Sequence, residues 1–312
     1  MTRHRLIVNP AAGGGSAERS VPLIERLLRE SGVEFDVVRT ERPLHAIELA
    51  REAAESGVDV VVAVGGDGTA NEALNGLIQA KTAGSGSAAL GVLCVGRGND
   101  FSFGVGIPRN LEAGCRALAA DRRRTIDVGR ATGGDFPEGR YFGNGVGIGF
   151  DTVVGLVAAK LKHQRGFTGY LVAALKTIFL YFKAPLVRVE TDNGSTELRA
   201  LMVSIMNGRR MGGGFMMAPD GRPDDGRFHL CIAKEVSRPR IFALILRFMN
   251  GTQASHPAIA TELSTRVTVT AIDGTLPAHA DGEILCEEGA EVTIEIVPAA
   301  IEIIVPLAGE SR

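Results

Sequence analysis

Three short glycine-rich stretches contain residues that could bind a nucleotide. They are residues 9–16 (NPAAGGGS), 65–72 (GGDGTANE) and 96–101 (GRGNDF), and the first lacks the Gly-Lys-Ser/Thr ending of a Walker loop. Glycine permits a positive φ and lets a phosphate approach the backbone N–H groups. Asp67 lies within the second stretch, and a carboxylate beside a phosphate requires a cation between them, so Mg²⁺ with a nucleoside triphosphate is the predicted ligand. The alternative is a tight turn in which Asp67 caps a helix.

Strands and helices alternate around these stretches. Apolar, β-branched runs at residues 5–8, 60–64 and 89–95 precede the three stretches, and a further strand is expected at residues 35–39. Helices are expected at residues 44–56 and in a segment that Ser20 would cap, because Pro22 suits a first turn. This alternation predicts an α/β fold with a doubly wound parallel sheet, in which the three stretches meet at the carboxyl ends of the strands.

The pattern changes after the three arginines at 122–124. Strands are predicted at residues 126–131, 141–150, 186–191, 198–206, 228–233, 266–272 and 292–297, which suits an antiparallel β-sandwich. Helical patterns interrupt them at residues 151–183 and 238–249. We therefore predict a nucleotide-binding domain at 1–124, a sandwich domain at 125–299, and a segment at 300–312 that either closes the second sheet or returns to the first domain.

Composition excludes several classes of protein. The chain is 45% hydrophobic with a net charge of −2, which argues against nucleic acid as the main partner. Its four cysteines have no metal-ligand spacing and are expected to be reduced, as in a cytosolic enzyme. The longest apolar segment, residues 170–182, is shorter than the ~20 residues that span a bilayer. A cytoplasmic protein is expected, and a homodimer stays open.

Residues 151–183 are basic and amphipathic. They contain five cations against one acid, Asp151, and the cations are Lys160, Lys162, Arg165, Lys176 and Lys183. This composition fits a helix pair that rests transiently on an anionic membrane surface at the inner face. It equally fits a helix packed on a sheet with a solvated lysine face.

Taken together, the motifs resemble the diacylglycerol kinase catalytic domain, and more narrowly the soluble bacterial lipid kinases of the diacylglycerol and sphingosine kinase superfamily. The second half agrees through residues 144–151 (NGVGIGFD), 207–208, 212–214, 218–219, 225–226 and 281–283 (DGE). The resemblance implies an NAD kinase-like or phosphofructokinase-like first domain, a β-sandwich second domain, and ATP between them. The implied reaction is phosphorylation of a membrane lipid, with diacylglycerol giving phosphatidic acid. Because the second motif also occurs in NAD kinases, a phosphotransferase for a soluble acceptor stays open, as does a non-catalytic lipid-binding homologue.

The resemblance also assigns roles to residues. Asp67 would act on the phosphates through Mg²⁺, Glu283 would be the general base with Asp281 beside it, and the alternative for 281–283 is a hairpin turn. Asn99 and Asp100 would face the substrate and the γ-phosphate. The remaining nucleotide-binding residues would be Asn9, Pro10, Gly13, Thr40, Gly65, Gly66, Gly68, Thr69 and Asn71.

Two of the three stretches depart from the family pattern. The first stretch has Ala12 and Gly14 where a small hydroxyl residue and a cation are usual, and the third has Arg97 where Thr or Ser is usual. Our hypothesis is that Arg97 supplies the missing cation to the nucleotide, and the competing view is that it blocks the usual nucleotide pose.

A second, structural Mg²⁺ is implied in the sandwich domain. Its ligands would be the carboxylate of Asp225 and the main-chain carbonyls of Arg222 and Arg227. The alternative is an acidic turn that binds nothing.

Overall fold

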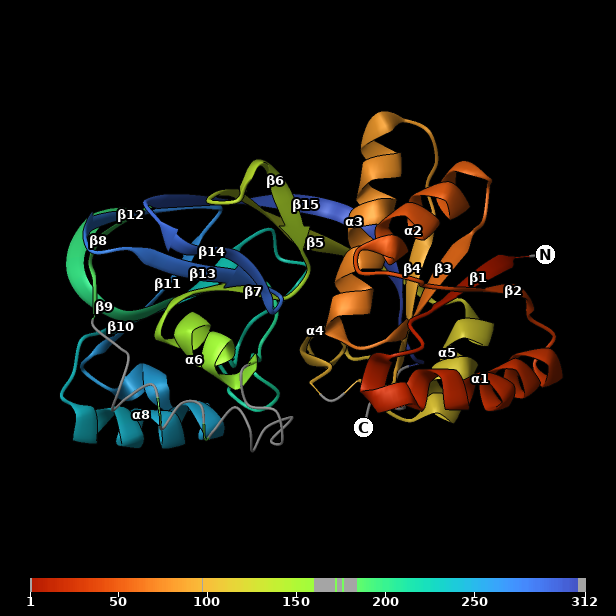
Figure 1. Ribbon diagram of the computed structural model, residues 1–312, viewed down its shortest axis with the longest axis horizontal. Coiled ribbons are helices and arrows are strands. Elements are labelled where there is room, and N and C mark those ends of the chain that lie inside the picture. Colours follow the sequence, from red (N-terminus) through yellow and green to blue (C-terminus); the bar gives the residue numbers. More distant parts are fainter. Residues whose placement is uncertain (1, 97, 160–171, 173–175, 177–183, 308–312) are drawn as a thin grey trace. The chain divides into compact units, whose positions relative to one another are not determined.

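The structure is a computed structural model that describes residues 2–96, 98–159, 172, 176 and 184–307 (Figure 1). The chain divides into two compact units, a first unit of Met1–Asp127 with Pro298–Arg312 and a second unit of Val128–Val297. Two strands, β5 (Arg123–Gly133) and β15 (Glu291–Ile304), have residues in both units.

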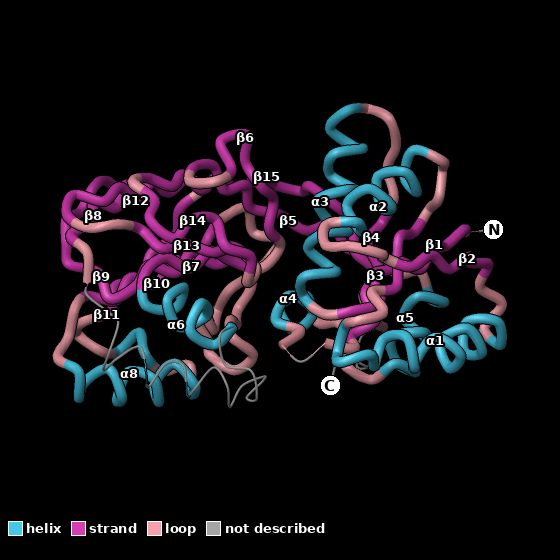
Figure 2. The backbone as a smooth tube through the Cα atoms, in the orientation of Figure 1, coloured by secondary structure: helices cyan, strands magenta, loops and turns pink. Residues whose placement is uncertain are grey.

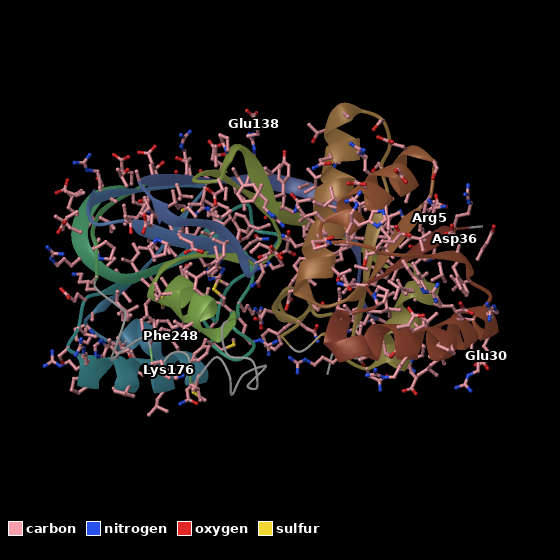
Figure 3. All side chains as sticks on the ribbon, in the orientation of Figure 1. Arg5, Glu30, Asp36, Glu138, Lys176 and Phe248 are labelled. Atoms are coloured by element: carbon pink, nitrogen blue, oxygen red, sulfur yellow. The ribbon has the colours of Figure 1, made fainter. Side chains whose placement is uncertain are left out.

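A parallel sheet forms the centre of the first unit. Its strand order is β4 (Ala89–Cys94), β3 (Val60–Gly65), β1 (Arg3–Val8) and β2 (Glu34–Arg39), and the end of β15 joins it beside β4 through Ile303 and Leu90. All of β3 and β4 is buried, because helices cover both faces and the runs carry apolar side chains on both. On β1 and β2, Arg5 and Asp36 point toward each other at 2.7 Å (Figure 3). The end of β15, whose place the sequence left open, returns to the first unit.

Two layers of helices cover this sheet. Helices α1 (Ala12–Glu30) and α5 (Leu111–Ala120) lie on one face, and α2 (His45–Glu55) and α3 (Asp67–Ala83) lie on the other (Figure 1). A short helix, α4 (Asp100–Val105), follows the third glycine stretch. Helices α2 and α3 approach closely, because Gly76 leaves only backbone and the methyl of Ala50 between them.

The start of α1 differs from the prediction. The helix assigned from Ala12 has helical backbone angles only after Gly15. It contains Pro22, and the hydroxyl of Ser20 donates backward to the carbonyl of Ser16 at 2.8 Å, so Ser20 is not its cap. Gly13, Gly14 and Gly15 have φ values of 62°, 70° and 84° at its start. These left-handed glycines form the turn that joins the strand to the helix. The predicted helix start is too late because a proline such as Pro22 usually marks the first turn.

An antiparallel β-sandwich forms the second unit (Figure 2). Strand β7 (Gly145–Gly149) lies between β13 (Leu276–Ala280) and β9 (Gly194–Met206). The other strands are β5, β6 (Phe136–Phe142), β8 (Leu186–Thr191), β10 (Phe228–Lys234), β11 (Ile259–Ser264), β12 (Arg266–Asp273), β14 (Glu283–Gly289) and β15. The fold class predicted from the sequence is confirmed, whereas the predicted strand at 141–150 is divided between β6 and β7, and β11, β13 and β14 had not been predicted.

Two helices and two apolar cores complete the second unit. Helices α6 (Phe150–Ala159) and α8 (Arg238–Asn250) cover one face of the sheet, and a short 3₁₀ turn, Gln253–Ser255, follows α8 (Figure 1). The rings of Phe142 and Phe228 stack at 5.8 Å in the core on the other face. Of the predicted helical region at 151–183, residues 160–171, 173–175 and 177–183 lie outside the described part.

Candidate active site

The structure brings the three glycine stretches together within the first unit. Because β1, β3 and β4 are neighbours in a parallel sheet, the loops that follow them lie side by side. A Cβ on Gly96 would lie 2.5 Å from the Cα of Gly66, and a Cβ on Gly13 would collide with the carbonyl of Val95. The loops therefore contact each other backbone to backbone, which only glycine allows at these positions.

Asn9 connects the first loop to the second. Its side-chain amide donates to the hydroxyl of Thr69 at 3.2 Å, and its side-chain carbonyl accepts the N–H of Ala11 at 3.1 Å. Pro10 lies within the turn so formed. Gly65 permits this arrangement, because a Cβ there would collide with the side chain of Thr69.

Asp67 lies where two helices begin. It is the first residue of α3, whose N-cap is Gly66, so it does not cap its own helix. Its Oδ1 accepts the N–H of Phe101 at 3.1 Å, in the first turn of α4, and a Cβ on Gly98 would lie 2.8 Å from its Oδ2. Helix dipoles stabilise the negative charge at both N-termini.

The other predicted nucleotide-binding residues surround these loops. Gly68 is in the first turn of α3, and Asn71, one turn further, is 3% exposed and accepts a hydrogen bond from the side chain of Asn75 at 3.2 Å. Thr40 directly follows β2, and its N–H donates to the carbonyl of Val8 at 2.9 Å.

The third loop holds the predicted substrate residues. Asn99 has a left-handed φ of 53° and donates to the carbonyl of Gly96 at 2.9 Å. Asn99 and Asp100 are both buried. Arg97, the predicted substitute cation, lies outside the described residues.

Two arginines that the sequence reasoning missed contact these loops. The guanidinium of Arg19, an exposed residue of α1, donates to the carbonyl of Gly14 at 3.3 and 3.4 Å. Arg109 donates to the carbonyl of Gly98 at 2.8 Å. The sequence contains a signal for Arg19, because it lies one helical turn after the glycine run, where a side chain can reach the glycine loop.

In the second unit, Asp281 and Gly282 form a two-residue turn between β13 and β14. Their φ values of 49° and 88° belong to a type I′ turn, which Asp-Gly favours. Residues 281–283 therefore include the hairpin turn that the sequence predicts as the alternative to a catalytic motif. Glu283, the predicted base, is the first residue of β14, pairs with Ala280, and is half-buried.

The carboxylate of Asp281 binds three backbone N–H groups. Its Oδ2 accepts from Gly143 at 2.8 Å, and its Oδ1 accepts from Asn144 at 3.0 Å and from Gly145 at 2.9 Å. Charge-assisted bonds of this kind are stronger than neutral ones. Asp281 thus fastens the turn to the segment that enters β7, across 136–138 residues of sequence.

In the loop predicted to hold a structural Mg²⁺, the carboxylates already interact with groups of the same segment. Asp225 Oδ1 accepts the N–H of Arg227 at 3.1 Å, and its Oδ2 lies 3.0 Å from Nε2 of His229. Arg222 is exposed, and its guanidinium lies 3.8 Å from the carboxylate of Asp224. Within the described chain, no group of three or more His, Cys, Asp or Glu side chains could hold a metal ion.

The cysteines are free and buried. Burial raises the pKa of Cys94 and, to about 11, the pKa of Cys115. Burial, with a smaller contribution from the nearby charge of Asp151, raises the pKa of Cys231 to about 12. These side chains stay thiols near neutral pH, which makes them poor nucleophiles.

A cavity of about 40 Å³ lies in the second unit. Ten of its eleven lining residues are apolar, among them Met202, Met217 and Phe248, and Figure 3 shows Phe248 on α8. The eleventh is Asp151, near the start of α6. The exposed wall of the cavity is apolar throughout. In the described part of the chain, no helix is both long and apolar enough to span a membrane.

Comparison with known proteins assigns the chain to a family. The diacylglycerol kinase catalytic domain matches residues 3–131, and the YegS C-terminal NAD kinase beta sandwich-like domain matches residues 144–305. A probable lipid kinase, YegS-like, from Klebsiella pneumoniae is 30% identical over 96% of this chain and 95% of its own length. The chain belongs to the diacylglycerol kinase family. A further relative of this kinase, a diacylglycerol kinase from Mycobacterium tuberculosis, is 28% identical over 97% of this chain and 95% of the relative.

Solved structures agree on the fold. A diacylglycerol kinase from Bacillus anthracis superposes with a TM-score of 0.74 at 22% identity, covering 98% of each chain. An NAD kinase from Archaeoglobus fulgidus in complex with ATP superposes with a TM-score of 0.53 at 16% identity, covering 99% of this chain and 98% of that one. The diacylglycerol kinase family member described here therefore has the fold of both.

Proposed function

We propose that this kinase transfers the γ-phosphoryl group of ATP to a hydroxyl of a membrane lipid, with diacylglycerol as the acceptor and phosphatidic acid as the product. The observation that carries the lipid acceptor is the apolar cavity in the second unit. The names of the family and of its relatives point to the same acceptor.

The first unit binds the nucleotide. Its glycine loops meet backbone to backbone where α3 and α4 begin, and a glycine-rich loop before a helix N-terminus suits phosphates. Mg²⁺ bound to a nucleotide takes most of its ligands from phosphate and water, so the single carboxylate of Asp67 fits it without a further cluster. When bound, the ion neutralises phosphate charge.

Cations of the chain complete the phosphate site. Arg19 replaces the cation that Gly14 does not provide, because its guanidinium already contacts the carbonyl of Gly14. Arg97 contributes a second guanidinium from the third loop. Equal ATP affinity in Arg97→Ala and the parent protein would contradict that second role.

The transfer needs a general base, and our candidate, Glu283, belongs to the second unit. The lipid oxygen bonds to the γ-phosphorus, the bond from that phosphorus to the β–γ bridging oxygen breaks, and ADP leaves. Glu283, a half-buried carboxylate that directly follows the hairpin turn, takes the hydroxyl proton in this proposal. Asp281 is a positioning residue, because both its oxygens are occupied by backbone N–H groups.

The cavity accepts part of an acyl chain. Its volume of about 40 Å³ is small, but methionine side chains such as Met202 and Met217 adapt their shape readily. Helix α8, which lines it, exposes Leu246 (61%) and Met249 (36%) and also carries the exposed arginines Arg238 and Arg240. These side chains suit transient contact with an anionic inner membrane face.

A structural Mg²⁺ at Arg222, Asp225 and Arg227 is part of the proposal. An ion there would share the Asp225 carboxylate with His229. We expect Mg²⁺ to raise the melting temperature of the nucleotide-free protein and to leave that of Asp225→Asn unchanged. Asp224→Asn, one residue earlier, is the matched control. Equal Mg²⁺ stabilisation of both variants would exclude the site.

The experiment for the acceptor is phosphoryl transfer to a panel in mixed micelles. The panel contains diacylglycerol, monoacylglycerol, ceramide, a sphingoid base, phosphatidylglycerol and undecaprenol, with NAD as the soluble acceptor. We expect labelled lipid, with a chain-length preference that changes in Phe248→Leu and does not change in Leu246→Ala on the exposed side of the same helix. Labelled NADP without labelled lipid would favour the NAD kinase-like alternative, which the likeness to NAD kinases supports.

A further inference from the structure

His279 occupies a buried position on β13, two residues before the Asp281–Gly282 turn. Only 7% of it is exposed, and it lies opposite Gly147 of β7. A Cβ on Gly147 would lie 2.6 Å from Nε2 of His279 and would collide with the carboxylate of Asp151. Gly147 therefore leaves the space that these two side chains occupy.

One hydrogen bond of His279 indicates its tautomer. Its Nδ1 lies 3.4 Å from the backbone N of Gly282, and a backbone N–H can only donate, so Nδ1 accepts. The proton of the neutral ring is then on Nε2, which faces Oδ2 of Asp151 at 3.7 Å. The ring connects the carboxylate on one side to the turn on the other.

Asp151 is fixed at the start of α6. It is 3% exposed, and its Oδ1 accepts the N–H of Thr152 at 2.9 Å. Thr152 in turn donates its hydroxyl to the carbonyl of Gly147 at 2.9 Å, which ties this helix end to β7. Asp151 is also among the residues around the apolar cavity, whose exposed wall carries no polar atom.

We propose that Asp151 and His279 are a positioning pair for the general base Glu283. Asp151 orients the His279 ring with its proton on Nε2, and Nδ1 of the ring holds the N–H of Gly282, which directly precedes Glu283. The three backbone bonds of Asp281 fix the other residue of the turn. This inference rests on the proposed function, in which Glu283 takes the proton of the acceptor.

Three substitutions of His279 separate its two contacts. The side-chain carbonyl introduced by His279→Asn would keep an acceptor near the Nδ1 position, so for this variant we expect a kcat within about threefold of the parent, whereas for His279→Gln and His279→Ala we expect a loss of about tenfold or more. The KM for ATP should not change in any of them. His256→Ala is the matched control, because His256 also accepts a backbone N–H, from Ala258 at 3.1 Å, in a loop of the same unit. Equal kcat in His279→Ala and His256→Ala would overturn the proposal.

A spectroscopic measurement tests the pair without an acceptor. Long-range ¹H–¹⁵N spectra of the histidine rings, assigned with His279→Gln, should show the Nε2-protonated tautomer for His279 above neutral pH, and Asp151→Asn should shift those ring signals. A ring protonated on Nδ1, or signals unaffected by Asp151→Asn, would overturn the pair even in an active enzyme. No transfer to any acceptor, with the expected tautomer and shift, would overturn the base role assigned to Glu283 and leave the Asp151–His279 contact established.

Discussion

The first unit and the second unit hold their functional loops by different means. In the first, glycine backbones pack directly against one another, as Gly66 and Gly96 do, and side chains such as Asn9 and Asp67 add hydrogen bonds between neighbouring loops and helix ends. In the second, the carboxylate of Asp281 binds three backbone N–H groups of a distant segment. Glycine lets a ligand approach the loop backbone closely, whereas the carboxylate clamp binds three backbone N–H groups within the fold. The difference suits a nucleotide site in one unit and a fixed base in the other.

Removing the charge of the clamp should have the largest effect on stability. Asp281→Asn keeps a residue that tolerates the left-handed turn but replaces a carboxylate oxygen with an N–H donor facing other donors. We expect the free energy of unfolding to fall by about 2–3 kcal/mol, measured by urea unfolding. Asp273→Asn, in the same unit with its side chain 66% exposed, is the control and should have little effect. Similar losses of unfolding free energy in the two variants would show that the Asp281 carboxylate does not hold the second unit's loops as described.

Adding one methyl group to the glycine contact should have the next largest effect. The Cβ of Gly96→Ala would meet the Cα of Gly66 at 2.5 Å and the side-chain oxygen of Asn99 at 2.8 Å. We expect a loss of about 1–3 kcal/mol in the free energy of unfolding, with weaker nucleotide binding. Gly155→Ala is the control, because nothing lies within 4 Å of its Cβ position. A fully stable Gly96→Ala protein would show that the loops separate easily.

Removing Arg19 should weaken the nucleotide site without loosening the loops. Arg19→Ala deletes an exposed guanidinium beside Gly14, and we expect about tenfold weaker binding of Mg²⁺–ATP by calorimetry. Arg26→Ala, on the same helix with its side chain 66% exposed, should bind as the parent does. An unchanged Kd in Arg19→Ala would contradict this role of Arg19 and leave Arg97 as the candidate for the missing cation.

A smaller effect concerns pH and the first unit alone. Burial lowers the pKa of His4 below its usual value of 6.5. The unfolded chain therefore binds a proton more readily than the folded one. The contribution of His4 to stability is constant above about pH 6.5, falls by at most about 1.4 kcal/mol per pH unit as the pH drops from there to the lowered pKa, and levels off below it. Thermal unfolding from pH 7.5 to 5 should show this fall, reduced in His4→Gln. An identical pH dependence in both proteins would contradict it.

The same contrast explains what the sequence could predict. The strands and loops of the first unit followed from β-branched runs that end in glycines, since neighbouring parallel strands must bring their loops together. The clamp of Asp281 could not be predicted, because its partners lie 136–138 residues away. Strand β13 was missed because its sequence, LPAHA, contains no β-branched residue and includes a proline. The contact between His279 and Asp151 was missed because it depends on the pairing of this unpredicted strand with β7.

The most direct test of the account is transfer of labelled γ-phosphate from Mg²⁺–ATP to diacylglycerol by the parent protein, Asp67→Asn and Glu283→Gln. Asp36→Asn, an exposed carboxylate of the first unit, is the control. We predict transfer by the parent and the control, and a loss of about 1,000-fold or more in the two site variants. Transfer that continues undiminished in Asp67→Asn, or a parent protein that binds ATP and labels no lipid, would contradict the account.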